Sequence, residues 1–194
     1  MRLIRRPALL SAKHAPSPIA NGPRPLAAGL IALAAVVACV HSGHAVAQDK
    51  PPEAVLVLQG TTGEPIRITA SEFKKLPHVD VEAVDHHGQK GRYSGVPMRA
   101  LLDKVGVPSG EKLRGRWLGA YVAVDALDDY RAVYALAELD PALSGRTIIL
   151  ADARDGKPLD KRHAPFQVIA PGEKRPARWV FQVHEIRVID SRAK

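Results

Sequence analysis

The chain has 194 residues, with 28 basic residues, 20 acidic residues and a single cysteine. Residues 1–47 hold five basic residues and no acidic one, so residues 48–194 carry 23 basic and 20 acidic residues, a net charge of +3. The high overall charge therefore does not indicate nucleic-acid binding, and we expect no nucleic-acid partner.

Residues 1–47 have the pattern of a secretory signal peptide. Basic residues come first, an apolar run extends from Leu26 to Val40, and the small-residue site Ala45-Val46-Ala47 precedes Gln48. This order is typical of a cleaved leader, and the apolar run is short for a membrane span. The pattern predicts a periplasmic or secreted protein with no stable membrane span after cleavage.

Three alternatives for this leader remain open. The pair Arg5-Arg6 permits twin-arginine export, and Cys39 permits processing as a lipoprotein. The apolar run permits an uncleaved anchor. If cleavage follows Ala47, the remaining protein has no thiol and no disulfide, so its stability comes from a packed core. About 150 residues are enough for one.

The first half of the remaining chain alternates short strands with short helices. Residues 48–60 form a polar lead-in and a first strand, and residues 61–194 form one domain without a linker or an internal repeat. Thr69 and Glu72 fit a capping box, which predicts a helix over residues 70–76. Pro97 and Gly106 mark the start and end of a second helix. Strands are predicted over residues 54–58, 66–69, 79–84 and 92–95.

The second half is rich in strands. Asp155-Gly156 predicts a tight turn because glycine adopts a positive φ without strain. A short helical piece is expected around residues 136–139. Strands are predicted over residues 117–126, 130–134, 147–151, 166–170 and 178–189. The fold class expected is therefore α+β, dominated by strands.

Two polar loops are candidate metal or ligand sites. His86 and His87 follow Asp85, and imidazole with carboxylate is a metal-ligand set; the alternative is a solvated hairpin loop. The segment 125–130 places three carboxylates in a short span, which suits a cation or a ligand hydroxyl; the alternative is an ordinary acidic turn. Four aromatic residues could line a pocket or pack on a sheet face: Trp117, Tyr121, Tyr130 and Tyr134.

A basic stretch is the third candidate. Six cations fall within 22 residues, and guanidinium and ammonium groups match phosphate oxygens. The alternative is a solvated charged rim. These cations are Lys157, Lys161, Arg162, Lys174, Arg175 and Arg178, with His163 among them.

Four stretches together resemble the sulfite-oxidase-type molybdopterin-binding domain. They are YSGVPMRALL (93–102), the strand and turn over 122–131, ILADARDGKPL (149–159), and PFQVIAPG (165–172) followed by ARWV (177–180). Their order and spacing cover most of residues 61–190. The resemblance implies the strand-rich middle-domain fold of sulfite oxidase, and a pterin cofactor that holds molybdenum through its dithiolene.

The resemblance also implies site residues. His163, Arg175 and Arg178 are expected at the pterin phosphate, and the loop with His86 and His87 at the metal. Other residues expected to bind the cofactor are Arg162, Lys174, Asp129 and Tyr130. The family's cysteine ligand precedes the 93–102 segment, where residues 85–90 contain none. Further departures from the family pattern are Ala164 for glycine, Gln167 for arginine, Asp129 for glycine and Arg178 for lysine.

Three functions follow as hypotheses. The first is an exported molybdopterin-dependent oxidoreductase that acts on a small anionic substrate or a sulfoxide with a redox partner protein. The second is a non-catalytic module that keeps the fold and binds a small anion or a partner protein. The third is a structural role in the cell envelope.

Overall fold

The structure is a computed structural model that describes residues 53–192. The predicted signal peptide, including Arg5-Arg6, Cys39 and the site after Ala47, lies outside these residues. Between residues 53 and 192, no helix is long and apolar enough to cross a bilayer.

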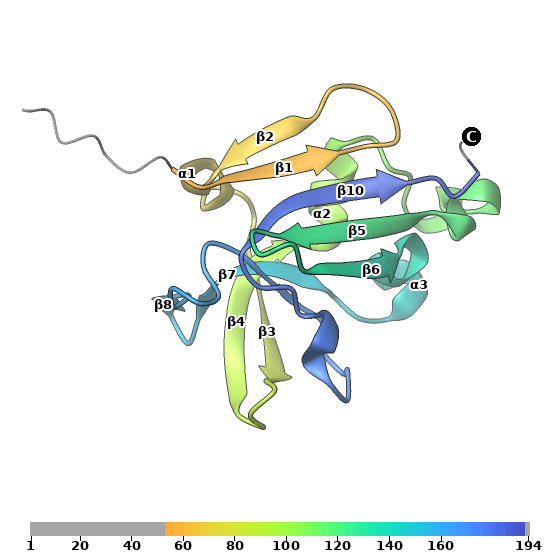
Figure 1. Cartoon of the computed structure of the whole chain (residues 1–194). Coiled ribbons are helices and arrows are strands. Elements are labelled where there is room, and N and C mark those ends of the chain that lie inside the picture. The colour runs from red at the N-terminus through yellow and green to blue at the C-terminus, as the bar shows by residue number, and fades with distance from the viewer. Residues whose placement is uncertain (1–52, 193–194) are drawn as a thin grey trace, which may run out of the picture. The chain divides into compact units, whose positions relative to one another are not determined.

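One five-stranded sheet crosses the upper half of the domain in Figure 1. Its neighbouring strands pair antiparallel, except β1 and β10, which run parallel with Val57 opposite Glu185. This parallel pair brings the first and the last strand of the described chain side by side. In order, its strands are β2 (Ile66–Thr69), β1 (Val55–Gln59), β10 (Val183–Ile189), β5 (Tyr121–Ala126) and β6 (Arg131–Ala135).

The second sheet carries most of the polar loops that matter below. All of its pairs are antiparallel, and the β3–β4 hairpin projects from it in Figure 1. Its strands are β3 (Val79–Val84), β4 (Lys90–Pro97), β7 (Ile149–Arg154) and β8 (Lys157–Pro158), with β9 (Gln167–Ile169) pairing with β7.

The helices are short and begin and end at sequence signals. Helix α1 (Ala70–Phe73) has the predicted capping box between Thr69 and Glu72. It is shorter than the helix predicted over residues 70–76, because residues 74–76 continue as hydrogen-bonded turns and not as α-helix. Helix α2 (Met98–Lys104) ends before Gly106, whose φ is 73°. The other helical turns are η1 (Gly110–Lys112), η2 (Gly115–Gly119), η3 (Leu136–Leu139), α3 (Pro141–Ser144) and η4 (Pro176–Arg178).

Both sheets and α2 share one hydrophobic core. Leu56 and Val124 come from the first sheet, and Leu150 and Val168 come from the second. The rings of Phe73 and Phe166 lie 4.5 Å apart between α1 and β9. This arrangement confirms the strand-rich α+β class predicted from the sequence.

Two predicted strands are wrong at their ends. The strand expected from Trp117 begins at Tyr121, because Gly115 adopts a φ of 62° and residues 115–119 form a 3₁₀ turn. The strand expected from Arg178 begins at Val183, because Pro176 starts the turn η4 and Gln182 has a φ of 50°. In both cases the apolar sequence predicts an extended strand, but a local backbone turn delays the start of that strand.

Gly95 allows the closest backbone approach in the second sheet. The register between β4 and β7 shifts between Ser94 and Gly95, so that Asp152 is left without a partner opposite it. A Cβ at residue 95 would lie 2.5 Å from the Cα of Ala151 and 2.7 Å from the carbonyl carbon of Leu150. Only glycine fits this bulge without displacing backbone.

We therefore expect Gly95→Ala to lower the free energy of unfolding by about 3 kcal/mol, through overpacking against backbone. Gly119→Ala is the control, since its added Cβ would meet only the hydroxyl of Ser191 at 3.4 Å. Urea unfolding followed by circular dichroism measures both, and equal midpoints for the two variants would contradict the close approach at Gly95.

Candidate functional site

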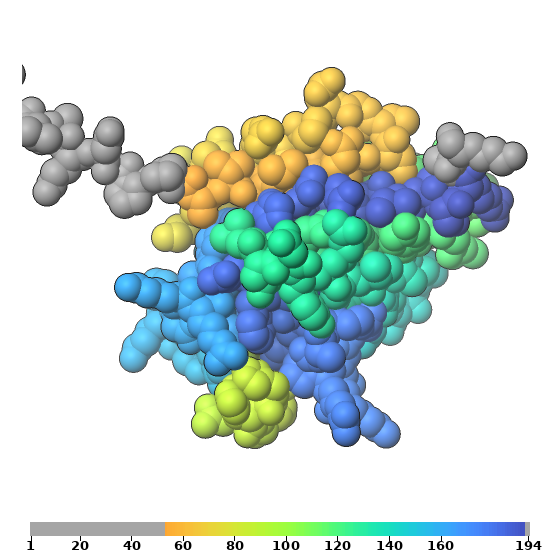
Figure 2. All heavy atoms as spheres, in the orientation of Figure 1, coloured from red at the N-terminus to blue at the C-terminus, as the bar shows by residue number. Residues whose placement is uncertain are grey.

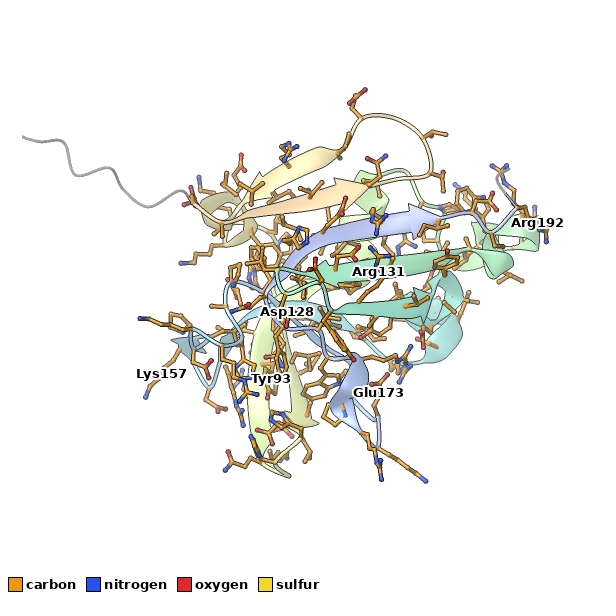
Figure 3. The ribbon with its side chains drawn as sticks, viewed as in Figure 1. Tyr93, Asp128, Arg131, Lys157, Glu173 and Arg192 are labelled. Atoms are coloured by element: carbon orange, nitrogen blue, oxygen red, sulfur yellow. The ribbon has the colours of Figure 1, made fainter. Side chains whose placement is uncertain are left out.

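A cavity of about 570 Å³ opens beside the β3–β4 loop, on the second sheet. In Figure 2 the loop of residues 85–89 projects between the segment after β8 and the segment before η4. Figure 3 shows Tyr93 on β4, with Lys157 on the β8 hairpin to one side. The cavity is lined by Asp85, His86, His87, Gln89, Tyr93, Arg154, Asp155, Lys157, Pro158, Leu159, Asp160, Arg162, His163 and Gln167.

Asp85 fixes the shape of the loop. One carboxylate oxygen accepts hydrogen bonds from the backbone N–H groups of His87 (2.8 Å) and Gln89 (2.9 Å), and the other accepts from Arg154 at 2.9 Å. Burial would raise the pKa of Asp85, but these three hydrogen bonds outweigh it and hold the pKa below its ordinary value. Asp85 is therefore an ionised anchor for the loop.

Arg154 spans the base of the cavity from β7. Its guanidinium lies 5.2 Å from the centroid of the Tyr93 ring, and a Cβ on Gly91 would lie 2.6 Å from its Nε. Glycine on the facing strand thus provides the space in which Arg154 reaches Asp85. Tyr93 is buried and packs edge-to-face on Trp179 at 5.8 Å, which fixes the ring beneath Arg154.

His163 is oriented by a carboxylate. Its Nδ1 lies 2.7 Å from Asp160, and its ring packs edge-to-face on Phe181 at 4.4 Å. The hydrogen bond with His163 lowers the pKa of Asp160. A neutral imidazole that donates from Nδ1 presents Nε2 as an acceptor. Since His163 lines the cavity, it offers either a proton acceptor or, when protonated, a cation that binds anions.

Gln167 is a buried polar group that faces the cavity. Only 4% of the residue is exposed, and its side-chain amide makes no hydrogen bond to any residue between 53 and 192. Between residues 53 and 192 no fully buried side-chain nitrogen or oxygen lacks a partner, so the amide atoms of Gln167 reach the open space of the cavity. The amide therefore marks a position where a ligand with both donor and acceptor atoms is favoured.

The two adjacent histidines lie at the mouth of this cavity. The rings of His86 and His87 stack with centroids 3.9 Å apart, and both side chains are exposed. Within residues 53–192 no three histidine, cysteine or acidic side chains converge as a metal site. The imidazoles alone thus provide at most part of a coordination sphere.

The predicted cations divide into two groups. Lys157 and Arg162 line the cavity, and Lys174 and Arg175 line a neighbouring one that also borders Asp85 and His86. These four side chains and Lys161 are exposed and form no ion pair with residues 53–192. Their positive charge is available to an anionic ligand.

Arg178 is different, because its charge is already compensated. It donates hydrogen bonds to Glu138 at 2.8 Å and to Glu173, and it stacks over the ring of Tyr134 at 4.5 Å. The hydrogen bonds to Glu138 and Glu173 outweigh burial and hold the pKa of Arg178 above its ordinary value. Arg178, the last residue of η4, therefore has a structural role in this geometry and offers no free charge to a phosphate.

The three carboxylates of segment 125–130 do not converge on one another. Asp125 is buried on the outer face of the first sheet, where it pairs with Arg131 and accepts a hydrogen bond from Arg187 at 2.9 Å. Asp129, with a φ of 66°, occupies a turn and borders a separate depression, whereas Tyr130 lines a second cavity described below. The structure thus agrees with the acidic-turn interpretation.

Sequence reasoning missed Arg154 and Asp160, and it named Asp85 only as a possible metal ligand beside the two histidines. Arg154 and Asp85 are 69 residues apart, and no local motif connects them. Asp160 lies three residues before His163, a spacing that a search for carboxylate–histidine pairs would have found. Gln167 was noticed only as a departure from a family pattern, and its burial is visible only in the fold.

The comparisons decide the family. Residues 43–194 match the family of oxidoreductase molybdopterin-binding domains. The chain belongs to this family. Among solved structures, the sulfane dehydrogenase SoxCD from Paracoccus pantotrophus has a TM-score of 0.56 and 18% identity, over 71% of this chain and 38% of that chain. At this identity the likeness shows the fold alone, and the chain spans well under half of that neighbour. No curated protein sequence matches the chain.

As a molybdopterin-binding domain, the chain confirms the resemblance inferred from its motifs and their spacing. Its single cysteine is Cys39, so residues 53–192 provide no thiolate. The polar cavity, with Gln167 inside and Lys157 and Arg162 at its edge, is the part of this molybdopterin-binding domain that suits a pterin phosphate.

We expect Asp85→Asn to destabilise the molybdopterin-binding domain by about 2 kcal/mol at pH 7, since Arg154 loses its charged partner. Because the pKa of Asp85 is lowered in the folded state, its contribution is present above the unfolded pKa of about 4 and disappears as pH falls through the folded pKa. Urea unfolding at pH 7 and pH 3 tests this. A difference between wild type and variant that stays constant with pH would contradict the ionised anchor.

Arg178→Gln is expected to lower the free energy of unfolding by about 2 kcal/mol, because two partly buried carboxylates lose a charged donor. The matched control Arg175→Gln, at an exposed position, should change it by less than about 0.5 kcal/mol. If the thermal midpoints of the two variants are equally close to wild type, Arg178 has no structural role.

Proposed function

We propose that this protein is exported and binds molybdopterin in the cavity beside residues 85–89, where it acts as an oxidoreductase by oxygen-atom or electron transfer at a pterin-held molybdenum. The observation that supports this most is the side-chain amide of Gln167, which has no hydrogen-bond partner between residues 53 and 192 and faces a cavity of about 570 Å³ in a domain of the molybdopterin-binding family.

The polar groups of the cavity suit the organic part of the cofactor. A pterin ring is planar and presents donors and acceptors side by side along its edge, and a carboxamide matches both. Gln167 would pair with that edge, and His163, held by Asp160, would present Nε2 to the ligand. Each group then satisfies a hydrogen bond that the protein alone leaves open.

The anionic part of the cofactor suits the exposed cations. Lys157 and Arg162 line the same cavity and have no carboxylate partner among residues 53–192. An arginine fork and a lysine ammonium bind phosphate with charge-assisted hydrogen bonds. Lys174 and Arg175 extend the positive potential beyond the Asp85 loop, which attracts an anionic substrate.

The metal side differs from the family pattern. When bound, the cofactor supplies a metal that changes its oxidation state during oxygen-atom or electron transfer. The chain would hold that group through its pterin and phosphate, because residues 53–192 contain no thiol. His86 and His87 are the side chains nearest in sequence to the expected cysteine, and neutral imidazoles favour different metal electronics from a thiolate.

Export and partners complete the proposal. The leader pattern of residues 1–47 supports a periplasmic or secreted location. A redox enzyme there needs an electron partner, and the exposed cations at the cavity suit a small anionic substrate. A module that binds anions without molybdenum is the outcome if the cofactor is absent.

The protein purified from a host that makes molybdopterin should contain about one molybdenum and one pterin per chain, by elemental analysis and pterin fluorescence. Gln167→Leu and the double variant Lys157→Gln/Arg162→Gln should lower the pterin content at least about tenfold, because the ligand loses its paired edge and its counter-charge.

Lys104→Gln, an exposed cation at the end of α2, is the matched control and should keep the full pterin content. Folded wild-type protein without molybdenum and pterin from such a host would overturn the redox proposal.

A further inference from the structure

A second cavity of about 470 Å³ lies next to the first and shares two residues with it. His86 and Arg162 line both cavities. The remaining lining is different in kind, since three aromatic rings and an apolar pair replace the polar groups. These residues are Tyr130, Trp179, Phe181, Pro176 and Ala177, with Asp128 and Gln182 at the edge.

Hydrogen bonds hold two of the aromatic rings in place, and of these Trp179 is buried, with 4% of the residue exposed. The hydroxyl of Tyr130 donates to the carbonyl of Ala177 at 2.6 Å, and the indole N–H of Trp179 donates to the carbonyl of Ala170 at 3.2 Å. Tyr130 is nevertheless 47% exposed. A ring that is both fixed and exposed is suited to contact a ligand, because little rotational freedom is lost on binding.

Gln182 connects the walls of the two cavities. Its backbone has a φ of 50°, a conformation that non-glycine residues rarely adopt and that costs about 1–3 kcal/mol. Three hydrogen bonds maintain it: to the carbonyl of Lys161 (3.1 Å), to the carbonyl of His163 (3.2 Å), and from the N–H of Leu127 (3.1 Å). The strained residue thus sets the distance between the segment with Arg162 and the turn before Tyr130.

Arg162 provides the charge of this cavity. It is exposed, and its guanidinium makes no hydrogen bond or ion pair with residues 53–192. An inorganic oxyanion would satisfy this cation but would leave the aromatic walls in water. A ligand with a flat apolar body and an anionic group satisfies both, since apolar area and charge pair are then buried together.

We propose that the second cavity is the substrate subsite, and that it takes aromatic organic oxyanions, with the anionic group at Arg162 and His86 and the ring against Tyr130 and Phe181. This inference rests on the proposed function, in which the first cavity holds the cofactor. The two shared residues then lie where substrate and cofactor meet.

Benzenesulfonate is the probe, and methanesulfonate, with the same charge and no ring, is its comparison. The Trp117→Phe variant leaves Trp179 as the only tryptophan of the chain, so its fluorescence reports occupancy of the second cavity. We expect saturable binding of benzenesulfonate at least about tenfold tighter than that of methanesulfonate. Equal affinities, or no fluorescence change with benzenesulfonate, would overturn the assignment.

Variants in this background locate the probe. Arg162→Gln and Tyr130→Leu, both at exposed positions, should each weaken benzenesulfonate binding about tenfold, whereas Lys161→Gln, the neighbouring cation outside the second cavity, should leave it unchanged. A loss in Lys161→Gln as large as that in Arg162→Gln would mean non-specific attraction and would overturn the subsite.

Pterin content measured on the Trp117→Phe protein and on its Tyr130→Leu variant separates this inference from the proposed function, because Tyr130 lines the second cavity alone whereas Arg162 lines both. Full pterin content without benzenesulfonate binding overturns the subsite and leaves the redox function in place. Specific benzenesulfonate binding to a protein that never acquires pterin retains the aromatic-anion site and overturns its role beside a cofactor.

Discussion

The ion pair between Asp85 and Arg154 is the interaction on which the rest of the site depends. It joins the loop after β3 to the middle of the second sheet, and it exists only because Gly91 leaves room for the guanidinium between the strands. Without it, the ring contact between His86 and Phe181, with centroids 6.1 Å apart, would be left to position the imidazoles of this five-residue loop. A charged pair that is only partly exposed contributes more than a surface pair, because solvent screens it less.

The domain uses its two sheets for different tasks. In the first sheet the buried carboxylate of Asp125 is paired with Arg131 and Arg187, and an interior parallel pair, β1 with β10, joins the two ends of the described chain. The second sheet keeps short strands and projects hairpins, whose loops supply the polar and basic residues. A rigid scaffold with functional loops at one edge is the usual division of labour in binding proteins.

Much of the fold could be predicted from the sequence because its signals are local. The capping box at Thr69, the stop at Gly106 and the turn at Asp155-Gly156 each depend on a few adjacent residues, and all three are confirmed. The site was predicted less completely, because its pairs are distant in sequence. A count of cations grouped Arg178 with Arg162, and only the fold shows that two carboxylates neutralise the first and leave the second free.

The way the 85–89 loop is held has a consequence for how its chemistry can change. Asp85 binds the backbone N–H groups of residues 87 and 89, and Gly88 provides the left-handed turn with a φ of 78°. None of these bonds uses the side chains at residues 86, 87 or 89. Substitution of the side chains at residues 86, 87 and 89 should therefore leave the path of the loop unchanged, so that a thiolate, an amide or a carboxylate can replace an imidazole there.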